Sequence, residues 1–236
     1  MLERLSSDPI DELTWLNKLS LKHLKNYQIW HHRQVTMTRV SALPQEELAF
    51  LSKMMTKDAK NYHVWSYRQW LVQHFDLWPT ATDPGTELPF IEALLKNDVR
   101  NNSAWNHRFY VLFGGERENN VSEEAFEKEI EFAKSKIDEA PQNASAWNYL
   151  KGVLKKRGGQ ADVNGLEDFA KTYADLEDVE GVKSSHAMDF LAGIWADKGE
   201  RENAEKALTL LAERFDPIRK NYWEWRKGLL GVQVKT

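Results

Sequence analysis

The chain has 236 residues, of which 42% are hydrophobic and 29% charged, with a formal net charge of −4 and no cysteine. This composition excludes a disulfide framework and cysteine-based zinc sites, and it favours a reducing, cytoplasmic location. The negative charge argues against general nucleic-acid binding, and no apolar run reaches the ~20 residues that membrane insertion requires.

The first predicted helix spans residues 8–24, with Asp8 as N-cap and Pro9 at the first helical position. A second helix is predicted to start at Pro44, and a loop is predicted over residues 77–87, which hold two prolines and a glycine. Ser122 is predicted to cap a longer helix with an apolar stripe at Phe126, Ile130, Ala133 and Ile137.

One phrase recurs along the chain, with an asparagine, a tryptophan four residues later and often an arginine three residues after that. Its copies lie near residues 26–33, 61–68, 101–108, 143–150 and 220–227. The tryptophans of the first four copies, at positions 30, 65, 105 and 147, follow one another at intervals of 35 to 42 residues. A degenerate repeat is predicted near 163–198. Further helices are expected over 163–176, 184–198 and 200–214.

Repeats of this length, with almost no strand signal, predict stacked helix pairs. We expect an all-α, right-handed α-α superhelix (solenoid) that forms a single repeat domain over residues 1–236. The asparagine is interpreted as the N-cap of the second helix of each pair, and the tryptophan as the anchor between layers. The arginine is expected to stack on an aromatic ring or to bind carbonyls of the neighbouring repeat.

The residue before the repeated asparagine is basic in four of the five copies: Lys25, Lys60, Arg100 and Lys220. The fourth copy has Gln142 at this position. A cation at a helix N-terminus opposes the helix dipole unless an anion shares the site, so this position suggests phosphate binding. The alternative is that these side chains are solvated or pair with nearby glutamates. No metal site is predicted, because the adjacent His31 and His32 diverge on a helix. The many carboxylates are assigned mainly to solvated faces, so no acid/base pair is singled out.

These phrases resemble the repeats of protein prenyltransferase α subunits, in particular the subunit shared by farnesyltransferase and geranylgeranyltransferase type I. The resemblance runs from about residue 10 to the C-terminal Asn-Tyr-Trp-Glu-Trp. It implies a heterodimer with a β subunit, in which a farnesyl or geranylgeranyl group passes from its diphosphate to a cysteine in a C-terminal CaaX sequence of a target protein. It also implies that this chain is inactive alone and binds no cofactor, because zinc, with magnesium as a further candidate, belongs to the assembled enzyme and zinc lies on the β subunit.

The resemblance also assigns site residues. Lys60 matches a lysine that approaches the isoprenoid diphosphate, and the expected substrate-binding residues are Tyr62, His63 and Asn101. Supporting roles, chiefly in packing, are expected for Arg68, Trp65 and Trp105.

Two departures accompany the match. The chain begins where the family usually has a further N-terminal repeat, and Leu150 replaces the arginine of the fourth copy. The alternatives are a non-catalytic tetratricopeptide-like scaffold that binds proteins, and the α subunit of the Rab geranylgeranyltransferase. The sequence does not specify which isoprenoid is transferred or which proteins are the substrates.

Overall fold

The computed structural model describes residues 8–41, 45–78, 86–114, 121–158 and 163–231. The predicted helix start at Pro44 and the middle of the predicted loop over 77–87 lie outside these residues. Within the described residues the regular structure is helical, with no strand. None of the described helices is long and apolar enough to cross a bilayer.

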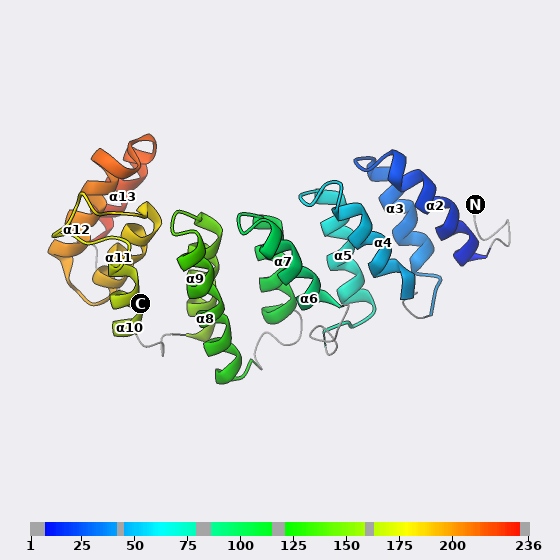
Figure 1. The fold of residues 1–236 in the computed structure, drawn as a ribbon, viewed down its shortest axis with the longest axis horizontal. Coiled ribbons are helices and arrows are strands. Elements are labelled where there is room, and N and C mark those ends of the chain that lie inside the picture. Colours follow the sequence, from blue (N-terminus) through cyan, green and yellow to red (C-terminus); the bar gives the residue numbers. More distant parts are fainter. Residues whose placement is uncertain (1–7, 42–44, 79–85, 115–120, 159–162, 232–236) are drawn as a thin grey trace. The chain divides into compact units, whose positions relative to one another are not determined.

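The contacts divide the chain into two compact units, residues 1–121 and 122–236. Unit 1 contains α2 (Pro9–Lys22), α3 (Tyr27–Met37), α4 (Gln45–Met55), α5 (Tyr62–His74), α6 (Glu87–Asn97) and α7 (Asn102–Phe113). Unit 2 contains α8 (Glu123–Glu139), α9 (Ala144–Arg157), α10 (Val163–Lys171), α11 (Ser185–Asp197), α12 (Arg201–Leu210) and α13 (Lys220–Leu229) (Figure 1). The single domain over 1–236 stays a prediction.

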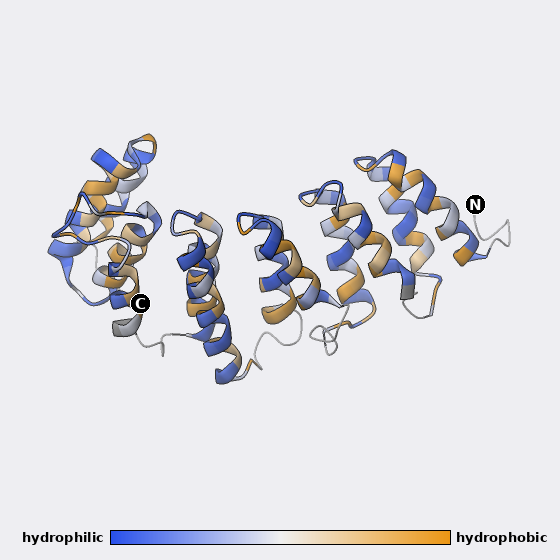
Figure 2. Ribbon diagram, in the orientation of Figure 1, coloured by the Kyte–Doolittle hydropathy of each residue, from blue (hydrophilic) through white to orange (hydrophobic). Residues whose placement is uncertain are grey.

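Each unit is built from antiparallel helix pairs whose second helices also pack on one another, α3 on α5 and α5 on α7 in unit 1, and α9 on α11 in unit 2. Polar and apolar residues interleave along the helices (Figure 2), as expected of elements that bury one face. The predicted stripe of α8 is buried throughout. The repeat tryptophans Trp30, Trp65, Trp105 and Trp147 are also buried, which confirms their role as anchors.

The repeated asparagine is the N-cap of the second helix in the first four copies. The side-chain oxygens of Asn26, Asn61, Asn101 and Asn143 accept backbone N–H groups of the following turn. In unit 1 the asparagine also joins neighbouring repeats, because the Leu24 carbonyl accepts both the indole N–H of Trp30 at 2.9 Å and the amide of Asn61 at 3.4 Å. The same arrangement recurs one repeat later, at Ala59, Trp65 and Asn101.

This double role predicts that Asn61→Ala costs more stability than Asn26→Ala. Both changes remove an N-cap, which is worth about 1 kcal/mol. The Asn61 change also removes the bond to Leu24, which adds about 0.5–1.5 kcal/mol. Urea denaturation of the two variants measures the difference, and equal losses would show that the bond between repeats contributes nothing.

The C-terminal copy departs from the expected pattern. A 3-10 turn over Pro217–Arg219 makes the chain helical before Asn221, so Asn221 lies inside α13 and is not an N-cap. The buried tryptophan is Trp223, whose indole N–H bonds to Asp216, whereas Trp225 is 59% exposed. The anchor of this copy is therefore shifted by two residues from the predicted position.

Two other helix boundaries differ from the prediction. The helix expected over 163–176 ends at Lys171, where Thr172 and Tyr173 form tight backbone turns and the Tyr173 carbonyl accepts the amides of Lys183 and Ser184. The loop predicted over 77–87 ends one residue early, because Glu87 is the first residue of α6. The helices predicted over 184–198 and 200–214 are confirmed, the second continuing as a π-helix over Leu211–Phe215.

Candidate functional site

The candidate site lies on one edge of unit 1, where three turns join the paired helices. We call this the turn edge: residues 23–27 between α2 and α3, 58–62 between α4 and α5, and 98–102 between α6 and α7. The three turns lie at the same end of unit 1 (Figure 1), and the asparagine bonds described above hold them together. Each turn presents a basic residue just before a helix N-terminus: Lys25, Lys60 and Arg100.

Lys60 forms an ion pair between turns. Its ammonium lies 3.0 Å from Oδ2 of Asp98, and the lysine and aspartate side chains are 58% and 46% exposed. The hydrogen bond from Lys60 holds the pKa of the Asp98 carboxyl below its ordinary value. Because the pair is solvated, its net contribution to stability is small and the lysine can exchange its partner for another anion at little cost.

The predicted substrate-binding residues differ in how much of each side chain is exposed to solvent. Tyr62 is 77% exposed, and its ring meets that of the half-buried His63 edge-on, with centroids 5.7 Å apart. Asn101 is buried and occupied as a cap, so it cannot contact substrate without breaking that cap. The structure thus places Lys60 and Tyr62 at the turn edge with His63 beside them in the first turn of α5, and Asn101 supports the next turn.

The residues expected to support the site are buried. Trp65 packs with its ring centroid 5.0 Å from that of His107 and 6.2 Å from that of Phe90, across the boundary between repeats. The Arg68 guanidinium lies 3.8 Å from the Phe90 ring centroid, which confirms the predicted stacking. Trp105 is also fully buried and donates its indole N–H to the Val99 carbonyl.

Arg68 also binds a carboxylate of the next repeat, a contact that was not predicted. Its Nε donates to both oxygens of Glu87, at 3.2 and 2.9 Å, and His107 Nε2 lies 2.5 Å from the same carboxylate. All three side chains are fully buried. Glu87 is therefore an exception to the prediction that carboxylates lie mainly on solvated faces, because the neighbouring repeat supplies the balancing charge.

Similar contacts recur along the array. Arg33 binds Glu47 through two nitrogens, and the Tyr67 hydroxyl donates to the same glutamate. In unit 2 the hydroxyl of Tyr149 donates to buried Glu129. Each glutamate lies on the first helix of a pair, twenty residues before its aromatic partner. This spacing of twenty residues is present in the sequence but lies outside the asparagine–tryptophan phrase, so the phrase did not predict these contacts.

The two other cations of the turn edge, Lys25 and Arg100, occupy the basic position of their repeats but are not among the predicted site residues. Lys25 precedes Tyr27, whose ring is 67% exposed and stacks on His31, with centroids 6.0 Å apart. Among the described residues neither Lys25 nor Arg100 has a salt bridge, in contrast to Lys60. Over the same residues, no three histidine, aspartate or glutamate side chains gather closely enough to hold a metal ion.

Comparison with known proteins identifies the family. The model of the protein prenyltransferase alpha subunit repeat matches residues 9–40, 44–75, 84–114 and 126–157. The chain belongs to this family. It is 37% identical over 222 residues to the protein farnesyltransferase/geranylgeranyltransferase type-1 subunit alpha of Candida albicans, covering 92% of this chain and 70% of that protein. A Dictyostelium discoideum protein of the same name is 34% identical over 118 residues, which cover 46% of this chain and 34% of that protein.

The prenyltransferase comparison extends to structure. A solved Candida albicans protein geranylgeranyltransferase-I complexed with GGPP matches with a TM-score of 0.86 and 35% identity, over 97% of this chain and 75% of that chain. The expected fold class, all-α with prenyltransferase-type helix hairpins, is confirmed. Family membership also favours the prenyltransferase subunit over the generic repeat scaffold, and both relatives bear the type-1 name rather than that of a Rab enzyme.

Proposed function

We propose that this chain is the α subunit of a heterodimeric protein prenyltransferase. The enzyme transfers a farnesyl or geranylgeranyl group from its diphosphate to a cysteine near the C-terminus of CaaX proteins, in the cytoplasm. The observation that carries this proposal is the 37% identity to a named type-1 α subunit over 92% of the chain, with four family repeats in order.

The β subunit supplies what this chain does not. The sequence has no cysteine, and the part of the chain that the structure describes holds no cluster of other ligands that fits a zinc ion. Zinc is therefore assigned to the β subunit, where it would lower the pKa of the acceptor thiol and make it a better nucleophile. Magnesium, if the assembled enzyme uses it, would bind with the diphosphate oxygens.

The turn edge is proposed to face the diphosphate in the assembled enzyme. When the acceptor thiolate attacks the prenyl carbon, a C–S bond forms, the C–O bond breaks and its electron pair remains on the diphosphate. A fixed ammonium beside that oxygen stabilises the growing charge. Lys60 takes this role by exchanging Asp98 for the diphosphate, and its neighbours Tyr62 and His63 contact the substrate.

Lys25 and Arg100 extend the same cationic edge. They occupy the equivalent position in the preceding and following turns, and neither is held by a salt bridge in the described part of the chain. A diphosphate carries several negative charges, so more than one of these cations can contribute to its binding. Trp65, Arg68, Trp105 and Asn101 keep the turns in register and do not contact substrate.

Co-expression with a protein prenyltransferase β subunit tests the proposal. We expect a stable complex that transfers a prenyl group to a CaaX peptide and loses activity when zinc is chelated. The α chain alone should be inactive. Failure to pair with the β subunits of both farnesyltransferase and geranylgeranyltransferase type I would contradict the proposal and favour the scaffold alternative.

A further inference from the structure

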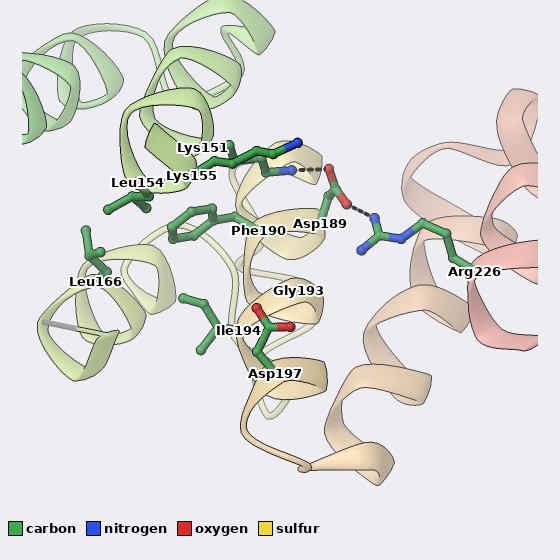
Figure 3. A pocket seen from close by; sticks show the side chains of 10 residues that line it. All are labelled: Lys151, Leu154, Lys155, Leu166, Asp189, Phe190, Gly193, Ile194, Asp197 and Arg226. Carbon is green, nitrogen blue, oxygen red and sulfur yellow. Dashed lines mark hydrogen bonds and ion pairs between the residues drawn. The ribbon is translucent and has the colours of Figure 1, made fainter. Parts of the chain in front are cut away.

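Unit 2 contains a cavity of about 480 Å³ formed by α9, α10, α11 and α13. One side is apolar, lined by Leu154, Leu166, Phe190 and Ile194 (Figure 3). These side chains are largely buried by their neighbours, yet they leave space between them that the described residues of unit 2 do not fill. An apolar hollow of this size at a protein surface is characteristic of a binding site.

A charged row borders the apolar side (Figure 3). Asp189 accepts from Lys151 at 2.5 Å and from Arg226, so it joins α9, α11 and α13. Burial alone would raise the pKa of the Asp189 carboxyl, but the two cations hold it below its ordinary value. Lys155 lies on the same border without a salt bridge among the described residues. Asp197 also lines the cavity, so the lining carries three cations against two carboxylates.

Gly193 lines the cavity, and its lack of a side chain leaves space there. It lies in the interior of α11, where glycine is less favourable than alanine, and a Cβ atom added there would meet no atom within 4 Å. Packing inside unit 2 therefore does not require glycine at this position. Close approach of another molecule to the helix backbone would require it.

An exposed apolar stripe on α13 and the preceding turn adjoins the charged border. Ile218, Tyr222, Trp225 and Leu229 are exposed, and they recur at intervals of four, three and four residues on one helix face. The Arg226 guanidinium lies 5.9 Å from the Tyr222 ring centroid, which connects the stripe to the border. A cavity continued by an exposed aromatic stripe is larger than a small-molecule site and is typical of a protein interface.

We infer that this cavity is an assembly site for the β subunit, which inserts an apolar side chain over Gly193 and places a neighbouring carboxylate against Lys155 and Arg226. The inference rests on the proposed function, which supplies the partner. The apolar lining favours an apolar side chain in the cavity, and the excess of cations on the border favours a carboxylate beside it.

Gly193→Leu tests the inserted side chain, with Gly193→Ala as the matched control. Both variants should keep the helical circular dichroism of the full chain and melt no lower than the wild type, because each replaces a helical glycine in open space. Leucine fills the cavity, so the dissociation constant of the heterodimer should rise by about tenfold or more, whereas alanine should change it by less than about threefold. Equal assembly of the leucine variant and the wild type would overturn the inference, as would a wild-type homodimer that Gly193→Leu abolishes.

Lys155→Glu tests the carboxylate and does not depend on how Gly193→Leu folds. The matched control is Lys206→Glu, an exposed lysine on α12 outside the cavity. The Lys155 variant should weaken assembly several-fold more than the control, and the difference should shrink as salt is raised. Equal effects of the two variants would overturn the inference. If the wild-type chain does not assemble with a β subunit at all, the proposed function itself fails, which is a separate result.

Discussion

Replacing Glu87 with glutamine is expected to lower the free energy of unfolding by about 3–5 kcal/mol, the cost of breaking a buried ion pair. The carboxylate is fully buried, binds Nε of Arg68 and lies 2.5 Å from His107 Nε2. Glutamine keeps the shape of the side chain but removes its charge, which leaves the Arg68 cation unpaired in the interior. Urea denaturation followed by circular dichroism measures the loss.

Glu92→Gln is the matched control for this prediction. Glu92 lies on the same helix and also binds an arginine, Arg108, at 3.1 Å, but its side chain is 53% exposed. Its replacement should cost less than about 1 kcal/mol. Similar losses for the two variants would show that burial does not determine the contribution of Glu87.

The pH dependence of stability provides a second readout of the same cluster. Burial alone would raise the pKa of Glu87, but His107 and Arg68 lower it from 4.5 to about 2. A carboxyl with a depressed folded-state pKa contributes stability that is present above pH 4.5 and is lost as the pH falls toward 2. Burial also lowers the pKa of His107 from 6.5, so its contribution is lost as the pH falls below 6.5. Glu87→Gln should remove the share of the acid destabilisation below pH 4.5 that comes from Glu87, and leave the share of other carboxyls with lowered pKa values, such as Glu167.

The local features of the repeats were predictable from the sequence because they depend on residues close together along the chain. An N-cap needs only an asparagine and the amides two and three residues later, so Asn61 could be assigned without knowledge of its neighbours. The indole of Trp65 bonds to the Ala59 carbonyl six residues earlier, inside the same turn. The period of the tryptophans then indicated stacked pairs.

The buried carboxylates were not predictable in this way, because their burial depends on the neighbouring repeat. Glu47 and Glu87 stand in the first turns of amphipathic helices, where acidic residues are usually solvated and favoured by the helix dipole. The cost of burying these two carboxylates is offset by Arg33 and Arg68, which come from the preceding repeat. The shift from Trp225 to Trp223 had a different cause, since Pro217 starts the helical turn early.

The candidate site was predicted in part. The basic position before each cap was visible in the sequence, and the structure places Lys25, Lys60 and Arg100 on one edge of unit 1. The salt bridge from Lys60 to Asp98 was not predicted, because its two residues are 38 positions apart and come together only when the repeats stack. Because Lys60 is paired with Asp98, its role can be tested by changing either residue of the pair.

Lys60→Ala is expected to lower turnover of the assembled enzyme about 10²-fold at saturating prenyl diphosphate, the usual effect of removing one group that stabilises a leaving charge. Assembly with the β subunit should be unchanged, because Lys60 is exposed and its only described salt bridge is a solvated pair. Single-turnover kinetics with a CaaX peptide measures the chemical step apart from product release.

Asp98→Asn provides the complementary variant, since it removes the carboxylate that competes with the diphosphate for Lys60. If Lys60 binds the diphosphate, this variant should retain full turnover and bind prenyl diphosphate at least as tightly as the wild type. Lys25→Ala and Arg100→Ala, measured in parallel, show how the three cations share the task. Full turnover by Lys60→Ala together with a large loss in Lys25→Ala would transfer the role to the preceding turn, whose lysine has no salt bridge to a described residue. The distinction is physical, because a cation already held by a carboxylate must release it before it can stabilise a departing diphosphate, whereas an unpaired cation has no such step.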